Sequence, residues 1–252
     1  MKIARFAYGD AVGFGVVDGR RITAIEGDAL GTLSPTGVSH ALAEVKLLPP
    51  VYPSKIIALG LNYRDHGEEL NLEMPAEPLI FMKPSSAVVG HLDAIRYPVM
   101  SERIDYEGEL GIVIGRMTTQ IEEADAHRCI LGYTCVNDVT ARDLQQKDGQ
   151  WTRAKGFDTF APLGPWIETE VDPDGLKIET FLNGERRQSS STSNLIFKPA
   201  FVVSFVSRIM TLYPGDVIAT GTPSGIGPML PGDEVDVVVE GIGTLTNRVV
   251  AS

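Results

Sequence analysis

Short apolar runs separated by turn residues constrain this chain more than any other feature of its sequence. Gly-Asp and Asp-Gly pairs, which favour tight hairpins, separate the first runs. Later runs are rich in Val and Ile, as is typical of buried strands. We expect strands over residues 2–7, 13–18, 21–24, 56–60, 111–115 and 235–239. The sequence therefore predicts a β-rich α+β fold.

Helical periodicity is clear in only two segments. Over residues 199–213, apolar residues recur at helical spacing until Pro214-Gly215 ends the pattern. A second helix is predicted from Thr119, which forms a capping-box pattern with Glu122, to the residue before Gly132. The apolar face of the first helix comprises Phe201, Val202, Phe205, Val206 and Ile209.

A proline-rich segment, Pro49-Pro50-Val51-Tyr52-Pro53, marks the expected domain boundary. Proline fixes the backbone and removes hydrogen-bond donors, so such a segment is typical of a stiff connection. We therefore expect a small N-terminal β domain at residues 1–50 and a larger domain at residues 51–252.

The charge balance excludes one class of partner. With 22 Lys and Arg against 33 Asp and Glu, the 252-residue chain carries a net charge of -11, which opposes binding to a polyanion. We therefore expect no nucleic-acid partner. The hydrophobic fraction of 43% is enough for a substantial core.

The two cysteines and the lengths of the apolar runs indicate where in the cell the protein is located. Cys129 and Cys135 lie close together without a second Cys/His cluster, so neither a disulfide framework nor a zinc site is indicated. Charged residues interrupt the first six positions, and no run reaches the roughly 18 apolar residues of a membrane span. We expect buried thiols, no membrane segment and a cytoplasmic location.

Three acidic residues stand beside or within apolar strands. Glu107 and Glu109 share one face of a strand that becomes apolar two residues later, because strand side chains alternate. Asp138 lies in an otherwise apolar or β-branched run, where an unpaired carboxylate is costly. A hard divalent cation would satisfy all three acids, and an all-oxygen set favours Mg²⁺ or Mn²⁺, with Ca²⁺ as an alternative. Two solvated acids at an exposed strand start are the simpler interpretation of Glu107 and Glu109 alone.

Two pairs of polar residues have the spacing of one helix face. Arg142 and Gln145 are three residues apart and follow Asp138, and an Arg side chain suits a carboxylate group. His66 and Glu69 have the same spacing, which is the arrangement needed for a general base. Taken alone, each pair is equally compatible with an ordinary surface region.

Two further segments carry groups that suit an anionic ligand. Lys155 lies among small and apolar residues, where an ammonium group can stabilise a developing oxyanion. Thr222 belongs to the Gly-rich segment 219–227, which is neither a P-loop nor a dinucleotide fingerprint. Its hydroxyl and the backbone donors there could hold a carboxylate, although a plain turn explains the segment equally well.

The ordered set of these motifs resembles the fumarylacetoacetate hydrolase family over roughly residues 55–250. The segments that carry the resemblance are Gly60 to Glu69, Phe81 to Ser86, Asp105 to Gly111, Asn137 to Gln145, Ala154-Lys155, Pro162 to Pro165 and Thr220 to Gly227. The resemblance implies a mixed β-roll catalytic domain behind a small N-terminal domain, usually as a homodimer.

The resemblance also implies roles for individual residues. Glu107, Glu109 and Asp138 match the metal ligands, and His66 with Glu69 matches a catalytic dyad on a lid helix. The lysine at the reacting oxygen matches Lys155, and the groups around the substrate match Arg142, Gln145, Thr222 and Lys83.

Substrates implied by the resemblance are small anionic 2-oxo acids. One site of this kind supports three reactions through an enolate: acylpyruvate hydrolysis, decarboxylation of oxaloacetate, or isomerisation of a conjugated dioate. The compact bacterial members that the chain is most similar to are named 2-hydroxyhepta-2,4-diene-1,7-dioate isomerase. The implied role is the catabolism of aromatic compounds or oxo-acid metabolism.

Two alternatives from other classes stay open at this point. Paired carboxylates on strands also occur in glycoside hydrolases, although only Trp151 and Trp166 are available as sugar platforms. A non-catalytic β module with a structural Ca²⁺ would leave His66 and Glu69 as ordinary surface residues.

Overall fold

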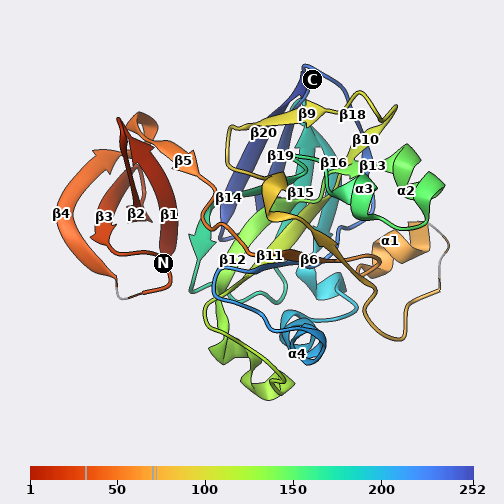
Figure 1. Cartoon of the computed structure of the whole chain (residues 1–252), viewed down its shortest axis with the longest axis horizontal. Coiled ribbons are helices and arrows are strands. Elements are labelled where there is room, and N and C mark those ends of the chain that lie inside the picture. The colour runs from red at the N-terminus through yellow and green to blue at the C-terminus, as the bar shows by residue number, and fades with distance from the viewer. Residues whose placement is uncertain (32, 70, 72) are drawn as a thin grey trace.

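The computed structural model describes residues 1–31, 33–69, 71 and 73–252. Figure 1 shows a small N-terminal lobe of strands, in red and orange, beside a larger body in which strands are central and helices peripheral. Over the described residues, the strands form one sheet of twelve, one of three and one of five.

The large sheet runs through both parts of the molecule. In spatial order its strands are β4 (Ser34–Ala41), β3 (Arg21–Glu26), β2 (Ala11–Asp18), β1 (Lys2–Tyr8), β14 (Ala161–Glu168), β12 (Ile130–Asn137), β11 (Gly108–Ile114), β17 (Val217–Ala219), β6 (Ile56–Leu59) and β7 (Ile80–Lys83). Two further strands join this path at its sides, β5 (Lys46–Leu48) on β1 and β8 (Val88–Val89) on β14.

The two smaller sheets complete the body. One consists of β13 (Thr140–Ala141), β10 (Ile104–Tyr106) and β18 (Gly227–Met229). The other consists of β16 (Glu185–Ser191), β15 (Lys177–Leu182), β19 (Glu234–Val239), β20 (Gly243–Ala251) and β9 (Ala94–Tyr97). Most pairs are antiparallel, but β6 with β17, β8 with β14 and β9 with β20 are parallel. The predicted β-rich α+β fold with mixed sheets is therefore confirmed.

The helices are short and lie outside the sheets. The α-helices are α1 (Arg64–Glu69), α2 (Arg142–Asp148), α3 (Thr152–Lys155) and α4 (Pro199–Ile209). The 3-10 helices are η1 (Leu42–Glu44), η2 (Ser85–Ala87), η3 (Glu123–Arg128) and η4 (Thr192–Asn194). Within the residues that the structure describes, no helix has both the length and the apolar character that crossing a membrane requires.

The N-terminal strands extend the sheet of the body instead of forming a separate layer. β1 pairs with β14 through Lys2 with Glu168 and Ile3 with Ile167. The proline-rich segment leads from β5 to β6, as expected of a connection. Because the sheet is continuous across the two parts, the division at residue 50 stays a prediction.

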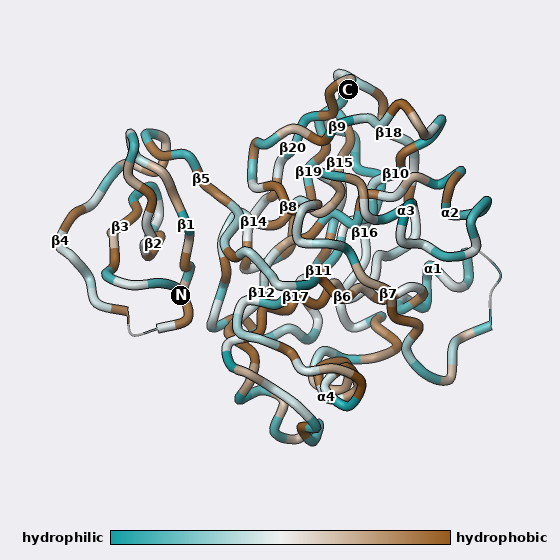
Figure 2. The backbone as a smooth tube through the Cα atoms, viewed as in Figure 1, coloured by the Kyte–Doolittle hydropathy of each residue, from teal (hydrophilic) through white to brown (hydrophobic). Residues whose placement is uncertain are grey.

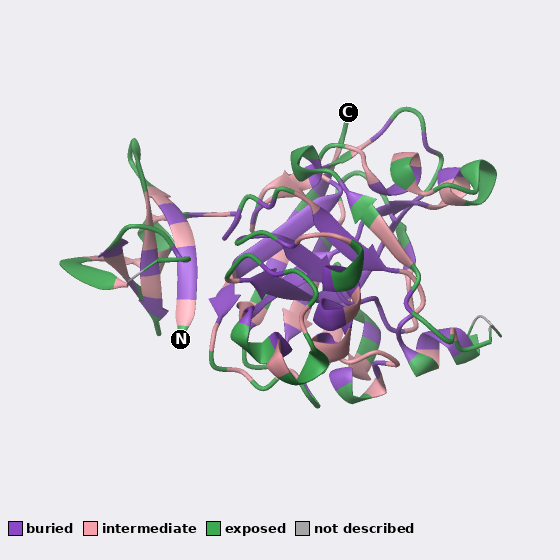
Figure 3. Ribbon diagram, turned by 60° about the horizontal axis from the view of Figure 1, so that its bottom comes forward, coloured by how far each residue is buried: buried purple, intermediate pink, exposed green. Residues whose placement is uncertain are grey.

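The core lies where β11 and β12 pass between the other strands. All seven residues of β11 are buried, and Figure 3 shows the central strands of the body in purple. Alternate side chains of a strand point to opposite faces, so a strand buried on both faces is apolar throughout. The segment from Leu110 to Ile114 meets this requirement, with Gly111 as the one position without a side chain.

The helix predicted over residues 199–213 is shorter than expected and turned relative to the predicted face. It ends at Ile209, which is 53% exposed, whereas Val203 is buried. Figure 2 shows the hydrophobic residues that gather on α4. The buried face therefore centres on Val202, Val203 and Val206.

The predicted helix from Thr119 was wrong. Only residues 123–128 are helical, as the 3-10 helix η3, and the next strand already begins at Ile130. Gln120 has a positive φ of 49°, and its N–H donates to the backbone oxygen of Ser207. The N–H of Ile121 donates to the Ser207 hydroxyl. A helix from Thr119 is interrupted because the positive φ of Gln120 lies outside the right-handed helical region. The two hydrogen bonds to Ser207 of α4 hold the segment in this conformation.

Candidate active site

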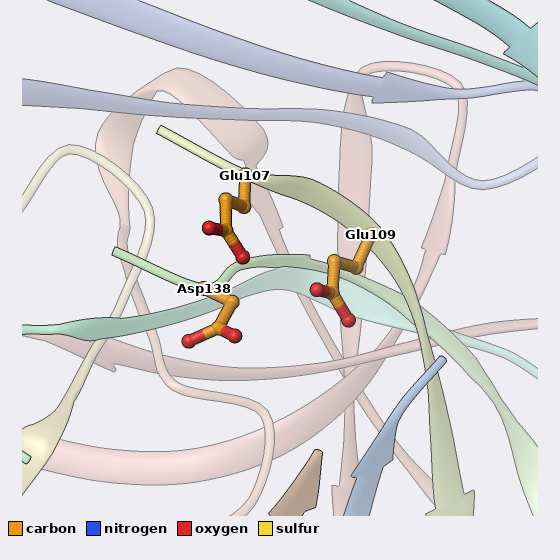
Figure 4. A group of neighbouring side chains, drawn as sticks. All are labelled: Glu107, Glu109 and Asp138. Carbon is orange, nitrogen blue, oxygen red and sulfur yellow. The ribbon is translucent and has the colours of Figure 1, made fainter. Parts of the chain in front are cut away.

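Glu107, Glu109 and Asp138 meet because two neighbouring strands bring them to the same edge. Glu107 occupies the single position between β10 and β11, Glu109 lies on β11, and Asp138 directly follows β12. The register places Gly108 opposite Asn137, and the N–H of Asp138 donates to the backbone oxygen of Glu107 at 2.8 Å. One carboxylate oxygen from each residue lies within 4.8 Å of the others, and all three residues are buried (Figure 4).

Two buried lysines and the partly buried Arg142 surround two of these carboxylates. Lys155 Nζ donates to Glu107 at 2.9 Å and to Asp138 at 2.6 Å. Arg142 donates to Glu107, and Lys83 donates to Asp138. Burial alone would raise the pKa of Glu107, but Lys155 and Arg142 outweigh it and hold that pKa at about 2. Glu107 therefore stays ionised.

The two lysines differ in their electrostatic environment. Burial lowers the pKa of Lys155, but the carboxylates of Asp138 and Glu107 reverse this effect and raise its pKa. At Lys83 burial prevails although Asp138 opposes it, and the charge of Lys155 adds to the lowering of its pKa. Lys83 also donates to the backbone oxygen of Val139 at 3.0 Å.

Glu109 has the least compensation of the three acids. Its Oε2 accepts a hydrogen bond from the N–H of Gly221 at 2.7 Å, whereas its Oε1 has no partner in the described part of the chain. Burial raises its pKa well above the usual range, and the charges of Asp138 and Glu107 raise it further. A buried oxygen without a partner, next to two carboxylates, fits a divalent cation well.

Arg142 is held by more partners than the sequence predicted. It begins α2, where its Nη1 donates to Gln145 at 2.5 Å, as the helical spacing predicted. Its Nε donates to Asp105 at 2.9 Å. Asp105 is completely buried on β10 and also accepts two hydrogen bonds from Arg103, at 2.8 and 3.1 Å. Asp105 therefore fixes the orientation of the Arg142 guanidinium.

Sequence reasoning missed Asp105, although a signal was present. The residue stands between Ile104 and Tyr106 in a buried strand, which is the same signal that identified Asp138. Its partner Arg142 lies 37 positions away in the sequence, so no local pattern connects the two.

His66 and Glu69 form the predicted pair on α1. His66 Nδ1 lies 3.1 Å from Glu69 Oε2, and the histidine side chain is 10% exposed. The helix begins at Arg64, so Asp65 lies in its first turn and not at the N-cap position. Asp65 instead accepts hydrogen bonds from the N–H of His66 at 2.9 Å and from the Ser190 hydroxyl at 2.5 Å.

Glu69 also connects α1 to the Gly-rich segment. Its two carboxylate oxygens lie 3.2 and 3.3 Å from the N–H of Gly225. The backbone oxygen of Gly225 in turn accepts the Tyr106 hydroxyl at 3.0 Å. The helix that carries His66 is therefore attached to the strand that leads to Glu107.

A cavity of about 300 Å³ connects most of the predicted polar residues. Its polar lining comprises His66, Glu107, Arg142, Gln145, Lys155 and Thr222. The other predicted residues, Lys83, Glu69, Glu109 and Asp138, are not among its lining residues. Lys83 contacts Asp138 and Glu69 contacts His66, so both support residues of the site.

Thr222 occupies the predicted position, but its hydroxyl is already engaged. It donates to the backbone oxygen of Gly108 at 2.9 Å and accepts from Gln188 at 2.8 Å. Gln188 also accepts the N–H of Gly108 at 3.0 Å. Thr222 thus fastens the Gly-rich segment to the start of β11, beside Glu109.

Comparison with known proteins identifies the larger part of the chain. Residues 55–250 match the fumarylacetoacetate hydrolase C-terminal family, and residues 1–50 match the Rv2993c-like N-terminal family. The structure of 2-hydroxyhepta-2,4-diene-1,7-dioate isomerase from Mycobacterium marinum is similar over 100% of this chain and 99% of that chain, with 46% identity and a TM-score of 0.94.

Two further relatives have names that describe reactions of oxo acids. Oxaloacetate tautomerase YisK of Bacillus subtilis is 43% identical over 225 residues, which cover 83% of this chain and 75% of that protein. Maleylpyruvate hydrolase from Sphingobium sp. SYK-6, in complex with manganese (II) ion and pyruvate, is 31% identical with a TM-score of 0.84 over both whole chains.

The family match decides between the classes that the sequence left open. The alternatives of a glycoside hydrolase and of a non-catalytic β module are wrong, because the chain matches the fumarylacetoacetate hydrolase family and its relatives include a named isomerase, tautomerase and hydrolase. From the match over residues 55–250 we conclude that this chain is an enzyme of the fumarylacetoacetate hydrolase family.

Proposed function

We propose that this enzyme requires a divalent cation and acts on a small 2-oxo acid in the cavity beside Glu107. The observation that carries the proposal is the Oε1 of buried Glu109, which has no partner among the residues that the structure describes and lies within the cluster of three carboxylates. Oxygen ligands favour Mg²⁺ or Mn²⁺, with Ca²⁺ as an alternative. The manganese ion in the related maleylpyruvate hydrolase supports this assignment.

Glu107, Glu109 and Asp138 would hold the cation. When bound there, a divalent cation supplies Lewis-acid polarisation of the 2-oxo group, which favours loss of a proton or of a carbon substituent at C3. The other groups of the cavity bind the substrate and move protons.

Arg142 is the group best suited to the substrate carboxylate. A guanidinium has five N–H donors, and three of them serve Asp105, Gln145 and Glu107. Two donors therefore remain for an anionic ligand. Because Asp105 holds the plane of the guanidinium, these donors are oriented before the substrate enters.

Lys155 is the group best suited to the oxygen that gains charge. Its ammonium has three donors, of which Glu107 and Asp138 take two. The third can reach a carbonyl oxygen in the cavity that Lys155 lines. A fixed donor in a dry site stabilises developing negative charge more than water does.

His66 is the proposed general base, with Glu69 fixing its ring through Nδ1. In acylpyruvate hydrolysis, His66 takes a proton from water, the water oxygen attacks C4, and the C3–C4 bond breaks. The released electron pair gives the enolate of pyruvate, which takes up a proton at C3. In tautomerisation or isomerisation the same base moves a proton without a water attack, and in decarboxylation the bond to carbon dioxide breaks instead.

We also propose a compartment, a metabolic role and an oligomeric state for this enzyme. We place the enzyme in the cytoplasm, in the catabolism of aromatic compounds or in oxo-acid metabolism, with two buried free cysteines that suit a reducing compartment. We propose a homodimer, which light scattering coupled to size exclusion would detect as twice the chain mass of 27.2 kDa.

The test is a substrate panel with purified protein. Acetylpyruvate, fumarylpyruvate and oxaloacetate are assayed for pyruvate release, carbon dioxide release and loss of the enol absorbance, with Mg²⁺, with Mn²⁺ and with chelator. We expect turnover of at least one substrate, and loss of that turnover with chelator. Inertness toward the whole panel, or turnover that chelator does not affect, would overturn the proposal.

A pair of histidine variants tests the base. His66→Ala should lower kcat by about 10²–10⁴-fold, the usual contribution of general base catalysis. His127→Ala is the matched control, because His127 is exposed in η3 and, among the described residues, its ring bonds only to the backbone oxygen of Ala124 in its own turn. Equal activity of the two variants would exclude His66 as the base.

A further inference from the structure

A second cavity lies next to the active-site cavity. It measures about 640 Å³ and is lined by β7, by residues 150–152 and by Met210. Phe81 and Trp151 line both cavities. Two rings that face both spaces form the wall between them.

The wall is built by close packing. The rings of Phe81 and Trp151 meet edge to face, with centroids 5.2 Å apart and an interplanar angle of 74°. Trp151 also lies against the backbone of Gly60. A Cβ atom at Gly60 would come within 3.3 Å of two carbons of the Trp151 ring and within 3.1 Å of Leu79 Cδ2. The position of Trp151 therefore depends on a residue without a side chain.

The wall is coupled to the reacting end of the site. Trp151 immediately precedes α3, and its backbone oxygen accepts the N–H of Lys155 at 2.9 Å. The ammonium of Lys155 lies 4.9 Å from the centroid of the Phe81 ring. The position of the wall relative to Lys155 is thus fixed by one helical turn.

The wall offers no charge to a ligand. The charged residues that line the active-site cavity are Glu107, Arg142 and Lys155, whereas Phe81 and Trp151 present aromatic carbon. A substrate whose carboxylate faces Arg142 would extend its other end toward an apolar surface.

We propose that Trp151 determines substrate specificity by limiting the length of the substrate's carbon chain beyond its 2-oxo group. The inference rests on the proposed function and specifies its substrate class as short 2-oxo acids with a small distal group. A longer apolar chain has room only where the wall is absent, because the space behind it is the second cavity.

The test measures binding, so that it does not depend on turnover. Saturated 2-oxo acids of increasing chain length are titrated calorimetrically into the protein with Mg²⁺. The affinity of the wild type should stop rising, or fall, once the chain reaches the wall. In Trp151→Ala the affinity should continue to rise, by about fourfold for each added methylene that becomes buried.

Two other variants keep the test specific. Met210→Ala enlarges only the second cavity, which Met210 lines without lining the first, so its length profile should match that of the wild type. Trp151→Leu replaces the ring by a smaller apolar group and serves if the alanine variant does not fold. Circular dichroism checks the fold of each.

The possible results separate the two proposals. If the wild type binds short 2-oxo acids and both Trp151 variants keep its length profile, the role of Trp151 is overturned while the proposed function stands. If the wild type binds no 2-oxo acid with Mg²⁺, the proposed function fails, and the inference fails with it. A longer optimum in the Trp151 variants alone supports the inference.

Discussion

Replacing Glu109 by glutamine should stabilise the metal-free protein. Glutamine keeps the acceptor for the N–H of Gly221 and removes a charge whose Oε1 has no partner in the described residues. Two unit charges 4.8 Å apart, the outer limit of the carboxylate cluster, repel by about 3.5 kcal/mol at an effective dielectric constant of 20. Lys155 cancels part of this repulsion, so we expect a gain of about 1–3 kcal/mol at pH 8.

The stability gain of Glu109→Gln in the metal-free protein should increase as the pH rises. Burial, Asp138 and Glu107 raise the pKa of Glu109 in the folded protein, so the folded state binds this proton more tightly than the unfolded chain does. The cost of the charge is absent below the unfolded pKa of about 4.3 and grows as the pH rises toward the folded pKa. The advantage of Glu109→Gln should therefore be small at low pH and largest above neutrality.

A divalent cation should reverse the order of stability. At a metal concentration of one hundred times Kd, the wild type gains about 2.7 kcal/mol, or about 5–11 °C in Tm for a chain of this size. Glu109→Gln should lose most of this gain because one ligand is missing. Urea and thermal unfolding, followed by circular dichroism with chelator and with Mg²⁺, measure both effects.

The exposed Glu123 supplies the control, since Glu123→Gln makes the same chemical change outside the site. It should alter neither the metal-free stability nor the metal-induced shift. A Glu109→Gln protein that is less stable than the wild type without metal, or that keeps the full metal-induced shift, would refute this reasoning.

Three further changes test the core, the substrate contacts and the thiols. Leu110→Ala, at a fully buried position of β11, should cost about 3–5 kcal/mol in urea unfolding, and a loss below about 1 kcal/mol would contradict the described packing. Arg142→Lys removes the planar fork and should raise KM for a 2-oxo acid by about 10–100-fold, so an unchanged KM would exclude the carboxylate contact. Burial raises the pKa of Cys135 to about 12, so a thiol reagent at pH 8 should leave it unlabelled in the folded protein and label it in denaturant.

The sequence predicted the acidic cluster because two of its three members violate a local rule. Asp138 interrupts a buried run, and Glu109 stands at the start of one, so both positions require a partner or a cation. The pair of His66 and Glu69 was equally visible, since a spacing of three residues on a helix fixes their proximity. These features depend only on local geometry.

Features that depend on distant segments were not predictable in the same way. Lys83 reaches Asp138 across 55 positions, and its role came only from the family resemblance. The pairing of β1 with β14 joins the two ends of a long stretch of chain. The failed helix at Thr119 shows the same limit, because the segment with the positive φ at Gln120 is bonded to α4, more than 80 positions away. Local patterns therefore predicted the residues of the site better than their connections.

The register of β11 and β12 links the identity of the fold to the proposed binding of a cation. Glu109 lies opposite Val136, and Asp138 follows one residue after Asn137. A slip of one residue would move Asp138 by about 3.3 Å along the strand and turn the alternate side chains of one strand to the opposite face. A misaligned molecule could retain much of its secondary structure and yet lose the cluster. If the proposed cation binds, its affinity would therefore serve as a quality control for recombinant or redesigned forms of this protein, since it would report strand alignment that a spectrum of secondary structure does not resolve.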